Sequence, residues 1–230
     1  MKTGILYVVA TPIGNLGDIT YRAVEILKKV DLIICEDTRT SKKLLDRYEI
    51  KNPTSSFYQN IRKGGAVKPV PKIEQILKEL SNGKDLALIT DAGTPGISDP
   101  GNQLVAEAVK NYVPVIPVPG ASSLTALASV AGIDLSEFVF MGFPPHKKGR
   151  ETFFKKISAL EVPVMYFESP HRFIKNLELL KTIAPDKEII LGRELTKVFE
   201  EIVRGNSEEV LKYFENNKEK IKGEFVIILK

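Results

Sequence analysis

The chain of 230 residues contains one cysteine, two histidines and no tryptophan. The single cysteine, Cys35, excludes an intrachain disulfide and a cluster of thiolate metal ligands. Cys35 ends the apolar stretch 31–35, so we expect a small core side chain there. These features fit a protein of the reducing cytoplasm with no bound metal.

Long apolar runs are also missing. No run approaches the ~18 residues that a membrane-spanning helix needs, and we therefore expect no membrane partner. The apolar stretch 5–10 is too short for a signal peptide and predicts a first strand. Hydrophobic content of 43% and charged content of 27% are typical of a soluble globular protein.

Three common catalytic signatures are absent as well. The chain has no GxGxxG motif and no Walker lysine motif, which argues against the usual dinucleotide and P-loop sites. No GxSxG motif surrounds a serine, so a hydrolase triad has little support.

Strand and helix patterns alternate along the chain, which predicts an α/β fold with parallel strands and right-handed crossovers. The expected strands are 5–10, 32–35, 86–89, 113–118, 138–141, 164–167, 189–191 and 225–229. The expected helices are 20–29, 41–48, 73–80, 103–109, 121–128, 152–160, 172–183 and 208–216.

A stretch with three prolines and a glycine, residues 113–120, predicts a stiff boundary between two α/β domains. We place the N-terminal domain at 1–116 and the C-terminal domain at 117–230. A cleft between two such domains is a common place for a small-molecule site.

The loop 90–101 is the most informative segment, with three glycines and two prolines among twelve residues. It follows a buried strand and precedes a helix. Glycine and proline together give a stiff backbone that a small polar ligand can approach closely. The alternative is an ordinary strand-to-helix turn, although connecting turns are usually shorter.

Other polar segments follow predicted strands. In the first half they are 11–18, 36–39 and 119–123, and parallel strands would bring them to one edge of a sheet beside loop 90–101. In the second half, 166–172 and 193–197 place charged groups at strand ends. An alternative for Glu168 and Arg172 is a structural ion pair.

Basic residues are concentrated in two places. The stretch from Arg39 to Lys72 has nine basic and two acidic side chains, a net charge of +7, with aromatic residues between them. A second cluster occupies 146–150. Basic surfaces with aromatics bind phosphates and stack unpaired bases, although each cluster could also be a solvated face.

Five motifs carry a resemblance to a known family. They are ATPIGNLGDIT (10–20), EDTR (36–39), DAGTP (91–95), ESPHR (168–172) and RELTK (193–197). In this order and combination they resemble the ribosomal RNA small subunit methyltransferase I group of the tetrapyrrole methylase superfamily. The matches cover nearly the whole chain.

The resemblance implies two α/β domains of the tetrapyrrole methylase type, a class III methyltransferase, with S-adenosyl-L-methionine in the cleft between them. It also implies a homodimer that methylates the ribose 2′-hydroxyl of a cytidine in the decoding region of 16S rRNA, with the small ribosomal subunit as its partner.

The resemblance places the cofactor loop at Gly93, Thr94, Pro95 and Ile97. It implies further cofactor contacts at Ser122, Ser123, Tyr166 and Phe167. The loops expected at the same sheet edge add Pro12, Gly14 and Asp91.

Attack by a ribose hydroxyl needs a group that takes its proton, and Asp37, Asp91, Glu168 and Glu194 are candidates. Arginine or lysine beside them could clamp phosphates. The catalytic candidates are therefore Asp37, Arg39, Glu168, Arg172, Glu194 and Lys197. The RNA-binding candidates are Lys42, Lys43, Arg47, Arg62, Lys63, Lys147, Lys148 and Arg150.

Two other functions remain open. A tetrapyrrole (precorrin-type) methyltransferase would need a wide apolar cleft and no basic stretch. A nucleotide-binding module would bind without catalysis. Transfer of labelled methyl groups to ribosomal RNA, to a porphyrinoid or to neither distinguishes the three.

Overall fold

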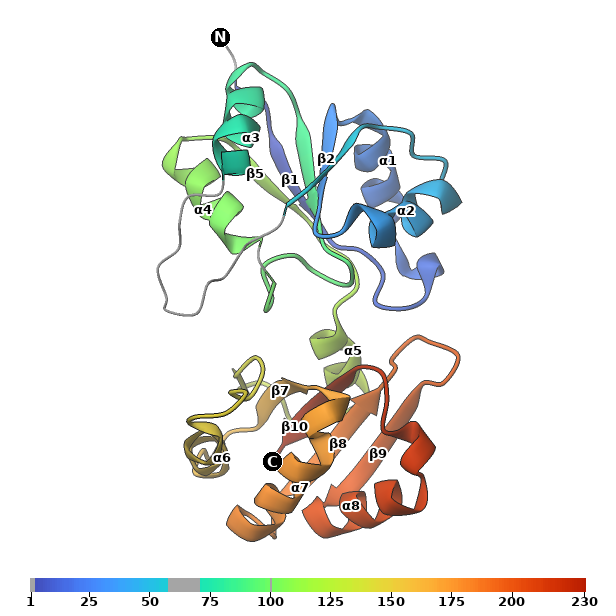
Figure 1. The fold of residues 1–230 in the computed structure, drawn as a ribbon, viewed down its shortest axis with the longest axis vertical. Coiled ribbons are helices and arrows are strands. Elements are labelled where there is room, and N and C mark those ends of the chain that lie inside the picture. The colour runs from blue at the N-terminus through green and yellow to red at the C-terminus, as the bar shows by residue number, and fades with distance from the viewer. Residues whose placement is uncertain (1–2, 58–70, 100) are drawn as a thin grey trace. The chain divides into compact units, whose positions relative to one another are not determined.

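The computed structural model describes residues 3–57, 71–99 and 101–230. The chain forms two compact units, Met1–Ser122 and Ser123–Lys230 (Figure 1). The boundary lies six residues after the predicted one, because β5 (Val115–Val118) belongs to the first sheet and pairs with β1 (Leu6–Val9). Its proline is tolerated because β5 is an edge strand, where a missing N–H does not interrupt the sheet.

The first unit contains a five-stranded sheet in the order β3-β2-β4-β1-β5. All its strand pairs are parallel, as the alternating pattern predicts. The remaining strands are β2 (Leu32–Cys35), β3 (Thr54–Ser56) and β4 (Leu86–Ile89). The helices are α1 (Tyr21–Lys29), α2 (Thr38–Arg47), α3 (Pro71–Ser81) and α4 (Asn102–Lys110), with a 3-10 turn at Leu16–Asp18.

Helices cover both faces of this sheet (Figure 1). Side chains alternate between the faces of a strand. Leu86 and Leu88 of β4 pack with α3 and α4, whereas Ala87 and Ile89 pack with α1 and α2. The first unit is therefore a three-layer sandwich, which leaves the strand ends as the place for polar loops.

The second unit contains a mixed sheet in the order β6-β7-β10-β8-β9. Only β6 and β7 are parallel; β10 runs antiparallel to β7 and β8, and β8 and β9 form an antiparallel pair. The expectation of parallel pairing is therefore wrong for this sheet. Its strands are β6 (Val139–Phe140), β7 (Val164–Glu168), β8 (Glu188–Arg193), β9 (Glu201–Asn206) and β10 (Phe225–Leu229).

Four helices complete the second unit: α5 (Ser123–Val130), α6 (Arg150–Ser158), α7 (Pro170–Ile183) and α8 (Ser207–Asn216), followed by a 3-10 turn at Lys218–Lys220. Helices α6, α7 and α8 bury aromatic side chains such as Phe154, Phe173 and Phe214 against one face of the sheet. Helix α5 contacts β10. Within the described ranges, no helix combines the length and apolar character needed to cross a bilayer.

Candidate functional site

Four loops lie at the carboxyl edge of the first sheet, as the sequence predicts. They follow β1 (residues 10–15), β2 (36–37), β4 (90–101) and β5 (119–122). The strand order places the loop after β1 between those after β4 and β5. Ligands of open α/β sheets bind at this edge.

Hydrogen bonds join three of these loops. The backbones of Thr11 and Gly93 exchange two hydrogen bonds of 2.9 and 3.1 Å, and Thr11 Oγ1 donates to the Thr90 carbonyl at 3.2 Å. Thr94 Oγ1 donates to the Ala121 carbonyl at 3.1 Å. The loops after β1, β4 and β5 are thus one connected structure.

Glycine makes this close approach possible. Gly93 has φ +84°, and a Cβ atom added there would lie 3.3 Å from Ile13 Cγ2. A Cβ atom on Gly120 would lie 3.0 Å from Ala10 Cβ. A larger residue at either position would push the loops apart.

Asp99, which the sequence analysis did not select, organises the far end of loop 90–101. Its carboxylate accepts hydrogen bonds from the backbone N–H groups of Ile97 and Gly101, at 3.1 and 2.7 Å, and from that of Gly96. Asn102 Nδ2 donates to the Gly96 carbonyl at 3.0 Å. These bonds hold the Ile97 side chain in an exposed position.

Three carboxylates meet at the same edge. The Asp37 N–H donates to Asp91 Oδ1 at 3.1 Å, and the Asp91 N–H donates to Glu36 Oε2 at 3.4 Å. Burial, together with the charges of neighbouring carboxylates, raises the pKa of Glu36 and the pKa of Asp91. Hydrogen bonds from Arg39 instead lower the pKa of Asp37 to about 2.

The predicted pair Asp37 and Arg39 is formed. Arg39 Nη2 lies 2.6 Å from Asp37 Oδ2, and the Arg39 N–H donates to Asp37 Oδ1 at 2.8 Å, so Asp37 also caps α2. A carboxylate with so low a pKa is a weak proton acceptor. Asp91, exposed and with a raised pKa, suits that role better.

The predicted pair Glu168 and Arg172 lies in the second unit. The Glu168 side chain is completely buried and accepts hydrogen bonds from the Ser169 N–H at 2.7 Å and from the side chain of Asn176. Arg172 Nε lies 3.8 Å from Glu168 Oε1, and Arg172 Nη1 donates to the Pro144 carbonyl at 2.8 Å. Burial raises the pKa of Glu168. These contacts match the structural alternative of the sequence analysis.

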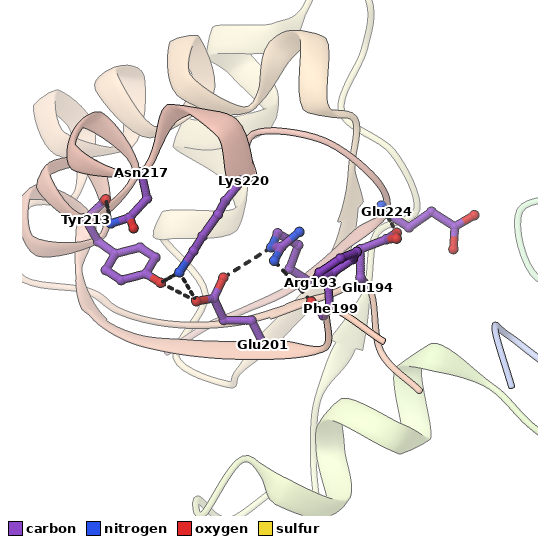
Figure 2. Close-up of polar contacts among 8 residues, drawn as sticks. All are labelled: Arg193, Glu194, Phe199, Glu201, Tyr213, Asn217, Lys220 and Glu224. Carbon is purple, nitrogen blue, oxygen red and sulfur yellow. Dashed lines mark hydrogen bonds and ion pairs between the residues drawn. The ribbon is translucent and has the colours of Figure 1, made fainter. Parts of the chain in front are cut away.

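Glu194 and Lys197 hold the turn after β8. Lys197 Nζ lies 2.9 Å from Glu194 Oε1 and 3.1 Å from Glu224 Oε2. The Glu224 N–H donates to Glu194 Oε1 at 2.9 Å (Figure 2). Glu194 and Thr196 both adopt positive φ, at 50° and 67°, in a conformation that costs a non-glycine residue energy.

A second network lies beside this turn (Figure 2). Arg193 Nε lies 3.2 Å from Glu201 Oε2, and Arg193 Nη2 donates to the Phe199 carbonyl at 3.0 Å. Glu201 Oε1 also accepts from Lys220 Nζ at 2.8 Å and from the Tyr213 hydroxyl. The charged motif at the end of β8 thus shapes the β8–β9 connection.

The predicted RNA-binding residues fall into three groups. Lys42, Lys43 and Arg47 are exposed on α2, and Lys147 and Lys148 are exposed before α6. Arg150 is half-buried and donates to the carbonyls of the preceding loop. Arg62 and Lys63 lie outside the described residues.

The predicted cofactor residues differ in accessibility. Pro12 and Pro95 are buried, Gly14 and Asp91 are exposed, and Ser122 and Ser123 are half-buried. Tyr166 lies in the core of the second unit against Phe153 and Phe154, so its side chain is unavailable to a ligand. Phe167 is half-buried and contacts Phe140 and Phe143.

The family model of the tetrapyrrole (corrin/porphyrin) methylases matches residues 5–211. Curated relatives named ribosomal RNA small subunit methyltransferase I align over nearly the full chain. The relative from Leptospira biflexa is 42% identical over 99% of this chain and 91% of its own length. The relative from Borrelia garinii is 44% identical over 98% of each chain.

Solved structures share the fold at low identity. A cobalt precorrin-4 methyltransferase aligns with a TM-score of 0.67 and 16% identity, covering 97% of this chain and 94% of its own. The uroporphyrin-III-C-methyltransferase from Thermus thermophilus aligns with a TM-score of 0.63 and 16% identity, covering 98% and 94%.

Proposed function

Because this chain belongs to the tetrapyrrole (corrin/porphyrin) methylase family, we propose that it is an S-adenosylmethionine-dependent methyltransferase acting on small-subunit ribosomal RNA. The observation that carries the proposal is the full-length similarity, at 42–44% identity, to relatives named for that activity. The finer assignment is the ribose 2′-hydroxyl of a cytidine in the decoding region of 16S rRNA. Assembly as a homodimer stays a prediction.

The carboxyl edge of the first sheet fits the methyl donor. When bound, S-adenosylmethionine supplies an electrophilic methyl group on a positively charged sulfur. The loops after β1, β4 and β5 pack closely there because Gly93 and Gly120 carry no side chain. Exposed Asp91, beside Glu36, supplies negative charge that favours a positively charged donor at this edge. Thr94 and Ile97, from the loop after β4, complete the proposed donor-binding site.

Asp91 is the proposed proton acceptor for the ribose hydroxyl. Methyl transfer depends mainly on holding the acceptor oxygen in line with the methyl carbon. A carboxylate with a raised pKa takes the proton more readily than Asp37, whose pKa is about 2. Arg39 is proposed to neutralise Asp37 and face the phosphates of the RNA.

Helix α2 is the proposed site for the RNA backbone next to this edge. Asp37 caps α2, so the helix begins where the carboxylates meet. Arg39, Lys43 and Arg47 recur every four residues and therefore share one face of the helix. Lysine and arginine on one face bind phosphates without reading sequence.

The proposal is tested by offering labelled S-adenosylmethionine with small ribosomal subunits, with naked 16S rRNA and with a porphyrinoid. We expect label in RNA, mapped to the ribose of one cytidine. Label in the porphyrinoid would identify a tetrapyrrole methyltransferase instead. Binding of the donor with no transfer to any substrate would leave a nucleotide-binding module.

A substitution tests the proposed donor-binding site separately from the substrate. Thr94→Trp places an indole in the loop after β4, and calorimetry should show that S-adenosylmethionine no longer binds. Thr94→Ser is the matched control, because it keeps the hydroxyl that donates to Ala121. Wild-type affinity in Thr94→Trp would show that the donor binds elsewhere.

A further inference from the structure

We propose that the loop between β6 and α6 is a base-stacking element, on which the ring of Phe143 holds an unpaired base of the RNA substrate. The inference rests on the proposed function and concerns a residue outside the predicted site. It is carried by an exposed aromatic ring, a rigid support and two neighbouring lysines.

The ring of Phe143 contacts one aromatic ring of the second unit and is half exposed. Its centroid lies 5.2 Å from that of Phe167, whose ring in turn lies 5.1 Å from that of Phe140. Phe143 nevertheless remains 50% exposed. A half-exposed aromatic ring that packs on one neighbouring ring can accept a base without rearranging the core.

The loop that carries Phe143 is fixed by two guanidinium groups. Arg172 Nη1 donates to the Pro144 carbonyl at 2.8 Å, and Arg150 donates to the carbonyls of Pro145 and His146. The Gly142 carbonyl accepts from the Phe167 N–H at 2.9 Å, which ties the loop to β7. Two consecutive prolines restrict the backbone further. The ring is therefore held in place before a base arrives, which reduces the entropy cost of binding.

Positive charge on the same loop favours RNA over an apolar partner. Lys147 and Lys148 are exposed, and no carboxylate forms an ion pair with either among residues 3–57, 71–99 and 101–230. The nearby Glu151 pairs with Lys155 at 2.6 Å. A ring for the base and lysines for the flanking phosphates are the two parts that single-strand binding sites combine.

This arrangement gives different roles to four basic residues, of which Lys147, Lys148 and Arg150 are predicted from the sequence as RNA-binding and Arg172 as catalytic. Arg150 and Arg172 point into the loop and act as positioning residues. The two lysines remain available to phosphate. The substrate nucleotide must be unpaired for its ribose to reach a methyl donor, so a stacking residue would stabilise the splayed strand.

The test compares Phe143→Ala, Phe143→Leu and Phe143→Tyr in the full chain, with a short single-stranded RNA of the decoding-region sequence carrying 2-aminopurine. We expect Phe143→Ala and Phe143→Leu to weaken RNA binding about tenfold and to lose the fluorescence quenching that stacking causes. Phe143→Tyr should stay within about twofold of wild type. Affinity for S-adenosylmethionine should not change.

The leucine variant keeps apolar contact with Phe167. If Phe143 served only packing, Phe143→Leu would therefore bind RNA like wild type, whereas loss of base stacking would weaken its RNA binding. Wild-type RNA affinity in Phe143→Ala would overturn the inference. So would a change of oligomeric state in Phe143→Ala, because the ring would then serve contact between copies of the chain. Failure of the proposed function is distinguishable, because wild type itself would then neither bind nor methylate the RNA.

Discussion

The two units of the chain hold their polar loops by different means. In the first unit, backbone and hydroxyl groups join the loops after β1, β4 and β5, and carboxylates accept from backbone N–H groups, as where Asp99 binds the Gly101 N–H. In the second unit, guanidinium groups donate to backbone carbonyls, as where Arg172 binds the Pro144 carbonyl and Arg193 binds the Phe199 carbonyl.

This difference separates charged side chains that hold the fold together from charged side chains that are accessible to a ligand. In the first unit Asp91 accepts one backbone N–H and stays exposed at the edge of the sheet. In the second unit Glu168, Arg172 and Arg193 are engaged by their neighbours and largely buried. A charged motif at a strand end is therefore a functional candidate only when the protein leaves its charged atoms accessible.

The largest expected loss of folding stability comes from removing a buried charged side chain in the second unit. Arg193 is 4% exposed, and Arg193→Met would leave the Phe199 carbonyl without its donor and remove one partner of Glu201. Removing one partner of a buried pair costs about 3–5 kcal/mol. Because Lys220 still pairs with Glu201, we expect about 2–4 kcal/mol, measured by urea denaturation.

A matched control is Lys155→Met, which breaks the exposed pair with Glu151 and should cost under about 0.5 kcal/mol. Hydrogen exchange at the amides of β8 and β9 assigns the loss to the second unit, since a chain of two units need not unfold in one step. Equal costs for the two variants would mean that the Arg193 network adds no stability beyond a surface pair.

The next effect concerns the backbone of the first unit. Gly93→Ala places a Cβ atom at a φ of +84°, 3.3 Å from Ile13. We expect S-adenosylmethionine affinity to fall about tenfold, a change of about 1.4 kcal/mol, because the loops after β1 and β4 must separate.

Gly132→Ala in the second unit is the control. Gly132 has a similar φ of +74°, but a Cβ atom there would have no neighbour within 4 Å. Both variants carry the strain of a left-handed residue, about 1 kcal/mol, whereas only Gly93→Ala should weaken donor binding in calorimetry. Equal affinity of the two variants for S-adenosylmethionine would show that Gly93 is not part of the donor-binding site.

The sequence predicts the first unit better than the second. Apolar runs such as 86–89 mark the buried parallel strands, whose order brings the polar loops together. The short β3 and the charged β9 were missed, because neither has a continuous apolar run. The antiparallel placement of β10 depends on contacts with β7 and β8 that local patterns do not encode.

The site shows the same limit. Glycine in loop 90–101 predicts close approach of a ligand, which stays a prediction, whereas the structure shows that Gly93 lets the loops after β1 and β4 approach each other. The partners of Arg150 and Arg172 are carbonyls of the loop before α6, and Arg172 lies 28 residues from its partner Pro144. Charge and spacing alone therefore did not predict these carbonyl partners.

The smallest expected effect is a pH-dependent change in stability, which compares a carboxylate of the first unit with one of the second. Burial and the charges of Asp91, Asp99 and Asp37 raise the pKa of Glu36 in the folded state. The folded protein then binds more protons than the unfolded chain as pH rises above the usual glutamate range, so stability falls through that window.

Glu201 behaves oppositely: burial alone would raise its pKa, but hydrogen bonds from Lys220, Tyr213 and Arg193 lower it overall. Its contribution is present at neutral pH and is lost as pH falls through the folded pKa.

We therefore expect Glu36→Gln to raise Tm at pH 7 by about 1 °C, a few tenths of a kcal/mol for a chain of this size. The gain should shrink as pH falls through and below the usual glutamate pKa, because Glu36 then becomes protonated in both states. Glu201→Gln should lower Tm at pH 7, with the loss shrinking as pH falls. Thermal melts across this range measure both, and a parallel pH response of the two variants would show that the units do not differ in how they use carboxylates. Opposite responses would mean that the first unit tolerates a destabilising charge at the edge where the methyl donor is proposed to bind, as expected when stability is given up for function.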